Sequence, residues 1–87
     1  MLFHISYEFP PEERDDAQAR FKATGAPAPD GVTMIGRWHS AAGHLGFTVA
    51  ESESVVAIGK WMQEWTDLLT FEITPVLTDE EVAEVIG

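Results

Sequence analysis

The stretch that decides the fold is residues 32–51, VTMIGRWHSAAGHLGFTVAE. Two strand-like runs, Val32–His39 and His44–Glu51, flank the short segment Ser40–Gly43. A segment of small residues that ends in glycine is typical of the loop of a β-hairpin. The sequence therefore predicts an antiparallel hairpin in the middle of the chain.

The chain before this hairpin predicts one strand and one helix. Residues 2–9 alternate apolar and polar side chains, which is the pattern of a strand with one buried face. Pro10-Pro11 ends that strand and begins a helix, because proline is tolerated in the first helical turn. Gly25 is expected to cap the C-terminus of this helix.

After the hairpin, the apolar spacing becomes helical and then alternates again. Ser52 or Ser54 is expected to cap a helix whose apolar stripe follows i, i+3, i+4 spacing. The stripe consists of Ile58, Trp61, Met62, Trp65 and Leu69. Residues 68–76 alternate as a fourth strand, and Thr78-x-x-Glu81 is a capping box that predicts a short tail helix.

These elements follow the order β-α-β-β-α-β, with one more helix at the end. We therefore predict a single ferredoxin-like α+β domain over residues 1–87, with a four-stranded antiparallel sheet and two helices on one face. Pro75 suggests that the last strand lies at an edge of the sheet. Gly59, inside the second helix, suggests close packing against a strand.

The charge of the chain excludes several classes of partner. The 87 residues contain 15 Asp and Glu but only 5 Lys and Arg, which gives a net charge of −10, and there is no cysteine. A phosphate backbone is a poor partner for such a chain, and a disulfide or a thiolate zinc site is excluded. Without a signal-peptide pattern or an apolar stretch of membrane-spanning length, we expect a cytoplasmic protein that binds neither nucleic acid nor a membrane. Because so short a chain buries a thin core, we expect it to form a homodimer.

Strict alternation assigns each strand residue to one of two sheet faces. The helix-covered face is predicted to collect Phe3, Ile5, Tyr7, Met34, Trp38, Phe47, Val49, Phe71 and Ile73. The opposite face is predicted to collect His4, Ser6, Glu8, Arg37, His39, His44, Thr48, Thr70, Glu72 and Thr74. A slip of one residue would exchange the members of a strand.

The histidines and the only strand arginine are the candidate catalytic residues. In one interpretation, His39 or His4 acts as an acid or base and Arg37 holds a carboxylate or enolate oxygen. In the simpler interpretation, the polar sheet face pairs with a second copy of the chain. A metal site from the histidines and Glu72 is chemically feasible, but the spacing is unspecific, and we predict neither a metal nor a cofactor.

The aromatic residues suggest a ligand pocket between the sheet and the second helix. The candidate ligand-binding residues are Tyr7, Trp38, Trp61, Trp65 and Glu72. Tryptophans at helical spacing are otherwise typical of a packed core.

Several short motifs carry a resemblance to a known family. They are Met1-Leu2-Phe3-x-x-x-Tyr7, Gly36-Arg37-Trp38-His39-Ser40, Gly46-Phe47, the run from Trp61 to Leu69, and Thr74-Pro75-Val76. On these residues nearly the whole chain resembles the small bacterial family called domain of unknown function 3303, which implies a ferredoxin-like domain without an established activity. More loosely, the expected fold is similar to the dimeric α+β barrel proteins, which include cofactor-free oxygenases, isomerases and haem enzymes.

We therefore expect a homodimeric small-molecule-binding or interaction module. The first alternative, by analogy with the dimeric barrels, is a cofactor-free isomerase or oxygenase. In that enzyme His39 or His4 would be the base, Arg37 the oxyanion clamp and Tyr7 the orienting residue. The second alternative is a structural assembly subunit in which the tail helix adds to the interface.

Overall fold

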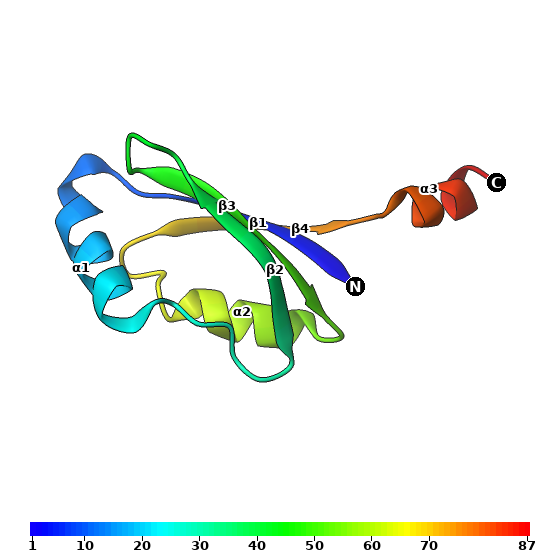
Figure 1. The fold of residues 1–87 in the computed structure, drawn as a ribbon, viewed down its shortest axis with the longest axis horizontal. Helices are drawn as coiled ribbons and strands as arrows, with labels where there is room; N and C mark the ends of the chain where they lie inside the picture. Colours follow the sequence, from blue (N-terminus) through cyan, green and yellow to red (C-terminus); the bar gives the residue numbers. More distant parts are fainter.

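The computed structural model describes all residues from 1 to 87 and confirms the predicted ferredoxin-like fold (Figure 1). Its elements, in chain order, are β1 (Leu2–Glu8), a short 3-10 turn (Pro11–Glu13), α1 (Arg14–Thr24), β2 (Val32–His39), β3 (Leu45–Ser52), α2 (Val55–Gln63), β4 (Thr70–Val76) and α3 (Asp79–Ile86). The strands form one antiparallel sheet in the order β2-β3-β1-β4. β4 therefore lies at an edge, as the proline at position 75 predicts.

The helix ends are formed by the residues that the sequence indicates. Gly25 adopts a left-handed conformation with φ 73° and donates its N–H to the carbonyl of Phe21, 2.7 Å away. The Ser54 hydroxyl accepts a hydrogen bond from the N–H of Ala57. At the start of α3, the Thr78 hydroxyl accepts a hydrogen bond from the Glu81 N–H, and the Glu81 carboxylate accepts one from the Thr78 N–H. The predicted capping box is therefore confirmed.

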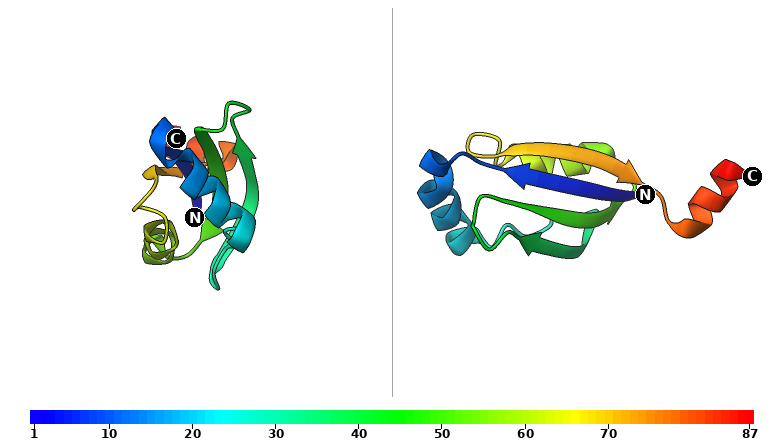
Figure 2. Two further views of the ribbon diagram at one scale, coloured as in Figure 1. Left: turned by 90° about the vertical axis from the view of Figure 1, so that its left-hand side faces the viewer. Right: turned by 90° about the horizontal axis from the view of Figure 1, so that it is seen from above.

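The core lies between the sheet and α2. Its buried residues are Phe3, Ile5, Val32, Ala50, Ile58, Trp61 and Met62. Both α1 and α2 lie on the same side of the sheet, but α1 crosses one end of it (Figure 2). Ala17 is the one buried residue of α1. Because α1 packs so little side chain against the strands, a space remains between α1, α2 and the sheet.

The predicted face assignment of β3 is wrong. Tyr7 pairs with Gly46 and Ile5 with Thr48, so the small even-numbered residues of β3 face the helices. Phe47 and Val49 therefore lie on the opposite face, which we call the open face. The residues of β3 that face the helices are small. They lie under α2 and under the space between α1, α2 and the sheet.

The predicted faces of Arg37, His39 and Trp38 are also wrong. A β-bulge between Met34 and Gly36 shifts the register of β2, so that Arg37 pairs with Thr48 and His39 with Gly46. Arg37 and His39 consequently face the helices, and Trp38 lies on the open face. One extra residue in the strand is enough to invert every side chain that follows it.

Three further observations concern the helices. Gly59 is not a close-packing site, because a side chain there would meet nothing within 4 Å. α3 projects away from the rest of the domain (Figure 1), and Val85 and Ile86 on it are 72% and 80% exposed. None of the helices is long and apolar enough to cross a membrane.

Candidate functional site

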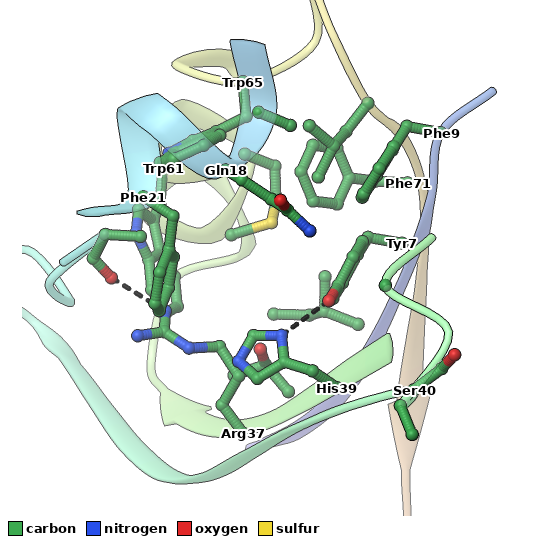
Figure 3. Close-up of a pocket in the computed structure, with 18 residues that line it drawn as sticks. Tyr7, Phe9, Gln18, Phe21, Arg37, His39, Ser40, Trp61, Trp65 and Phe71 are labelled. Atoms are coloured by element: carbon green, nitrogen blue, oxygen red, sulfur yellow. Dashed lines mark hydrogen bonds between the residues drawn. The ribbon is translucent and has the colours of Figure 1, made fainter. Parts of the chain in front are cut away.

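The space between α1, α2 and the sheet is a pocket of about 370 Å³ (Figure 3). This volume lies within the range of about 300–1,000 Å³ that is common for small-molecule sites. Its apolar wall comes from the strands and from both helices. The large residues of that wall are Phe9, Phe21, Trp61, Met62, Trp65, Leu69 and Phe71.

One corner of the pocket is polar and is built around a hydrogen bond between β1 and β2. The hydroxyl oxygen of Tyr7 lies 2.5 Å from Nδ1 of His39. These strands do not neighbour each other, because β3 runs between them. Gly46 of β3 makes the contact feasible, since a side chain at that position would collide with the Tyr7 ring and with the carbonyl oxygen of Trp38.

Arg37 forms the second part of this corner. Its Nη1 and Nη2 atoms donate to the carbonyl oxygens of Ala26 and Gly25, at 2.8 and 3.0 Å. Both of these residues have positive φ, 42° at Ala26 and 73° at Gly25, so the loop after α1 turns its carbonyls toward the guanidinium. The guanidinium carbon also lies 5.0 Å from the centre of the Phe21 ring. No carboxylate forms a salt bridge with Arg37.

The protonation states of the corner follow from burial and from the arginine charge. Burial, and then the nearby Arg37 charge, lower the pKa of His39, so the imidazole is neutral at physiological pH. Burial raises the pKa of Tyr7 despite the opposing effect of Arg37, so the phenol stays protonated. Burial lowers the pKa of Arg37, although a guanidinium still keeps its charge. The Tyr7 hydroxyl can therefore donate to Nδ1 of His39, which leaves the imidazole proton on Nε2.

The structure brings five of the sequence-derived candidates together and separates three from them. The candidates that line the pocket are Tyr7, Arg37, His39, Trp61 and Trp65. His4, Trp38 and Glu72 lie on strand positions that face away from it. The three histidines do not converge on a shared metal site, since no group of three or more metal-binding side chains occurs in the structure.

The pocket also contains residues that sequence reasoning did not single out. Phe9 continues the alternation of β1 after Tyr7, and Phe71 is the β4 partner of Tyr7, so the same period-2 pattern could have identified both as pocket residues. Gln18 of α1 points into the pocket (Figure 3). The i, i+4 pair Ala17 and Phe21 marks the apolar side of α1, and both residues line the pocket. Gln18 follows Ala17 and precedes Phe21 by three positions, so this pair could have identified it.

The open face carries the polar residues expected of β1 and β4, and an aromatic patch lies among them on β2 and β3. Phe47 lies at its centre, stacked on the His4 ring with centroids 5.1 Å apart, and the Trp38 ring lies 5.2 Å from it on the other side. Trp38 is 53% exposed and Phe47 38%. Exposed aromatic side chains that gather on one face mark an interaction surface.

With the fold and pocket in place, comparison with known proteins gives the family. The model of the family described as Domain of unknown function (DUF3303) matches residues 1–87. The chain belongs to the DUF3303 family. The resemblance drawn from the sequence is therefore confirmed over the whole chain.

Solved structures add the fold of this DUF3303 protein but no activity. It is similar to the structure of Rv0793 from Mycobacterium tuberculosis, with a TM-score of 0.54 and 18% sequence identity. The match covers 90% of this chain and 96% of the other. At that identity the likeness shows a shared fold alone. Among curated proteins, no significant sequence match is found.

Proposed function

We propose that this DUF3303 protein is a homodimeric module that binds a small organic molecule in the pocket between α1, α2 and the sheet. The observation that carries the proposal is the pocket itself, in which an aromatic wall faces a corner formed by Tyr7, Arg37 and His39. A largely apolar cavity with a few converging polar groups is the usual form of a small-molecule site.

The tryptophans serve the pocket as well as the core. Trp61 is only 2% exposed and belongs to the core cluster, yet it also lines the pocket. Trp65 is fixed by Arg20, whose guanidinium carbon lies 5.4 Å from the indole centre. Arg20 in turn donates two hydrogen bonds to the Asp67 carboxylate, at 2.8 and 2.7 Å. These contacts tie α1 to the segment after α2, and they support a pocket whose wall is held in place before a ligand arrives.

A fluorescent probe tests the pocket directly. We expect the neutral dye N-phenyl-1-naphthylamine to bind with increased emission, as it does in apolar cavities. Gln18→Trp places a large side chain in the pocket on an exposed helix position and should abolish the increase. Gln63→Trp is the matched control, because Gln63 is also exposed on a helix but does not line the pocket. Retained binding by the Gln18 variant would contradict the proposal.

The open face is the surface through which we propose that two copies associate. The exposed aromatic pair Trp38 and Phe47 lies at its centre, and a symmetric dimer would cover the same patch on both copies. α3 projects away from the domain and exposes Val82, Val85 and Ile86, and we propose that this helix adds to the interface. Light scattering after gel filtration should give about twice the chain mass of 9.6 kDa, and a mass near 10 kDa would contradict the dimer.

The second candidate function is a cofactor-free isomerase or oxygenase, in which His39 removes a proton from carbon. The observation that favours it is the neutral imidazole between Tyr7 and Arg37, because a base beside an oxyanion clamp is the arrangement that proton abstraction needs. His4 has no part in it, since it lies on the open face. This role needs the tautomer in which Nδ1 donates to the Tyr7 oxygen and Nε2 accepts the proton.

An enolisable aryl oxo acid, phenylpyruvate, tests this second function. His39 would take a proton from the carbon beside the ketone and deliver it to the enolate oxygen, which Arg37 binds while it forms, so that the product is the enol. Absorbance of the enol should then change faster with the wild type than with His39→Gln. Equal rates for the two proteins would leave binding as the function.

A further inference from the structure

We propose that the pocket selects ligands that carry one anionic group on a planar apolar body, and that Arg37 makes this selection. The inference rests on the proposed small-molecule function and specifies the chemistry of its ligand. It follows from how the charges of the chain are distributed around the pocket.

The pocket has the opposite charge to the chain. The protein carries 15 acidic residues and a net charge of −10, yet none of the acidic residues lines the pocket. One of the 5 basic residues does, and it is Arg37. The remaining polar side chains of the lining carry no formal charge, and they are those of Tyr7, Gln18, His39, Ser40 and Thr48. A cationic ligand would meet only repulsion there, whereas an anionic one would meet a single fixed positive charge.

Arg37 differs from the other arginines in its partners. Arg14 forms a salt bridge with Asp15, and Arg20 forms one with Asp67. Arg37 bonds only to two backbone carbonyls, which carry no formal charge. A partly buried guanidinium without an anion is costly, and the cost is offset when a carboxylate binds.

The same two hydrogen bonds prepare Arg37 for a ligand. A guanidinium has five N–H donors in one plane, and the carbonyls of Gly25 and Ala26 occupy two of them. The side chain is thus oriented before binding, so little conformational freedom is lost when its other donors bind an anion. Arg37 is therefore built to receive a planar two-oxygen group such as a carboxylate.

His39 supplies a second donor beside this charge. With the Tyr7 hydroxyl donating to Nδ1, the imidazole carries its proton on Nε2, and this N–H is free for a ligand oxygen. Beyond this corner the lining is aromatic, with Phe9, Phe21 and Phe71 beside Trp61 and Trp65. Aromatic side chains pack favourably against the rings of flat ligands, which completes the assignment of a planar apolar anion.

A pair of ligands with the same ring and different charge tests the inference. We would titrate the wild type with 2-naphthoate and with 2-naphthamide by isothermal calorimetry, at about pH 7.5, above the lowered pKa of His39. Charge-assisted hydrogen bonds predict that the carboxylate binds roughly tenfold to a hundredfold more tightly than the amide. In Arg37→Gln this preference should disappear, so that the two ligands bind with equal affinity. Arg14→Gln is the matched control, because Arg14 does not line the pocket, and it should keep the full preference.

Each outcome separates this inference from the proposed function. Equal affinity of the wild type for both ligands would overturn the anion selection and leave the binding function intact. If neither ligand bound while the neutral dye did, the inference would also fail. If the dye failed as well, the proposed function itself would be overturned. The wild-type comparison needs no variant, so the test holds even if Arg37→Gln does not fold.

Discussion

The Tyr7 hydroxyl lies 2.5 Å from Nδ1 of His39, although the two residues belong to strands that are not neighbours. Between them, Gly46 of β3 is the pairing partner of both. Because glycine has no side chain, the Tyr7 ring can lean across β3 and reach the imidazole. The polar corner of the pocket thus depends on one glycine that takes no part in it chemically.

The first prediction concerns this glycine. Gly46→Ala would place a methyl group against the carbonyl oxygen of Trp38 and the Tyr7 ring. We expect the free energy of unfolding to fall by about 1–3 kcal/mol, as is usual for overpacking. Urea denaturation followed by circular dichroism measures it. An unchanged urea midpoint would contradict the close packing around Gly46.

A second glycine should behave in the opposite way. Gly59 lies inside α2, and an added side chain would meet nothing within 4 Å. Alanine loses less backbone entropy on folding than glycine, so Gly59→Ala should stabilise the protein by about 0.5–1 kcal/mol. Thermal melting of both glycine variants in one buffer makes each the control of the other. A destabilised Gly59 variant would refute this prediction.

The third prediction is a pH dependence of stability that arises from His39. The groups that face its ring are Tyr7 from β1, Arg37 from β2 and Phe21 from α1, whose ring centroid lies 5.3 Å away. Burial and Arg37 lower the pKa of His39 in the folded state below its ordinary value of 6.5. Below that pH, the unfolded chain takes up a proton that the folded chain does not, so stability should fall as the pH decreases through 6.5.

The His39→Gln variant isolates this effect. The wild type should lose more stability between about pH 7.5 and 5.5 than the variant, because His4, His44 and the carboxylates are common to both. Urea unfolding at several pH values measures the difference. Parallel curves for the two proteins, or a wild type that acid stabilises, would contradict the assigned environment of His39.

The fourth prediction concerns the dimer. Two copies that each carry −10 repel one another, and salt screens this repulsion. Raising the ionic strength from about 0.02 to 0.5 M should therefore tighten association through the aromatic patch of the open face. Sedimentation at both salt concentrations measures the dissociation constant. Salt that weakens the dimer would indicate an interface held by charge pairs.

The open face and the pocket can be separated by one variant. Trp38→Ala should weaken the dimer, because the exposed indole lies beside Phe47 at the centre of the open face. The same variant should still bind N-phenyl-1-naphthylamine, since Trp38 does not line the pocket. Loss of dye binding together with the dimer would mean that the dye reports the open face.

The sequence predicts the order of helices and strands better than it predicts the side of the sheet on which each strand residue lies. Proline, glycine, serine and the capping box are local signals, and the helix ends at Gly25, Ser54 and Thr78 follow from them. β3 misleads because its larger apolar residues, Phe47 and Val49, point away from the helices while small residues face them. Burial in β3 is decided by how much room α2 leaves, which alternation alone does not reveal.

Residue type correctly indicates the polar residues of the candidate site, but strand alternation predicts the wrong sheet face for some of them. Arg37, His39 and Tyr7 are selected by residue type, yet alternation puts the first two on the wrong face. The cause is the bulge after Met34, for which the sequence carries no clear signal. The pocket itself depends on the position of α1 relative to the sheet, and this is a tertiary property.

The location of a bound ligand tests the account most directly. We would record intermolecular nuclear Overhauser effects between 2-naphthoate and the wild-type protein. Binding in the pocket predicts contacts from the naphthalene protons to the Trp61 and Trp65 indoles and to the Met62 methyl group, which line it. Contacts to Trp38 and Phe47 on the open face, without any to these three residues, would contradict the central claim.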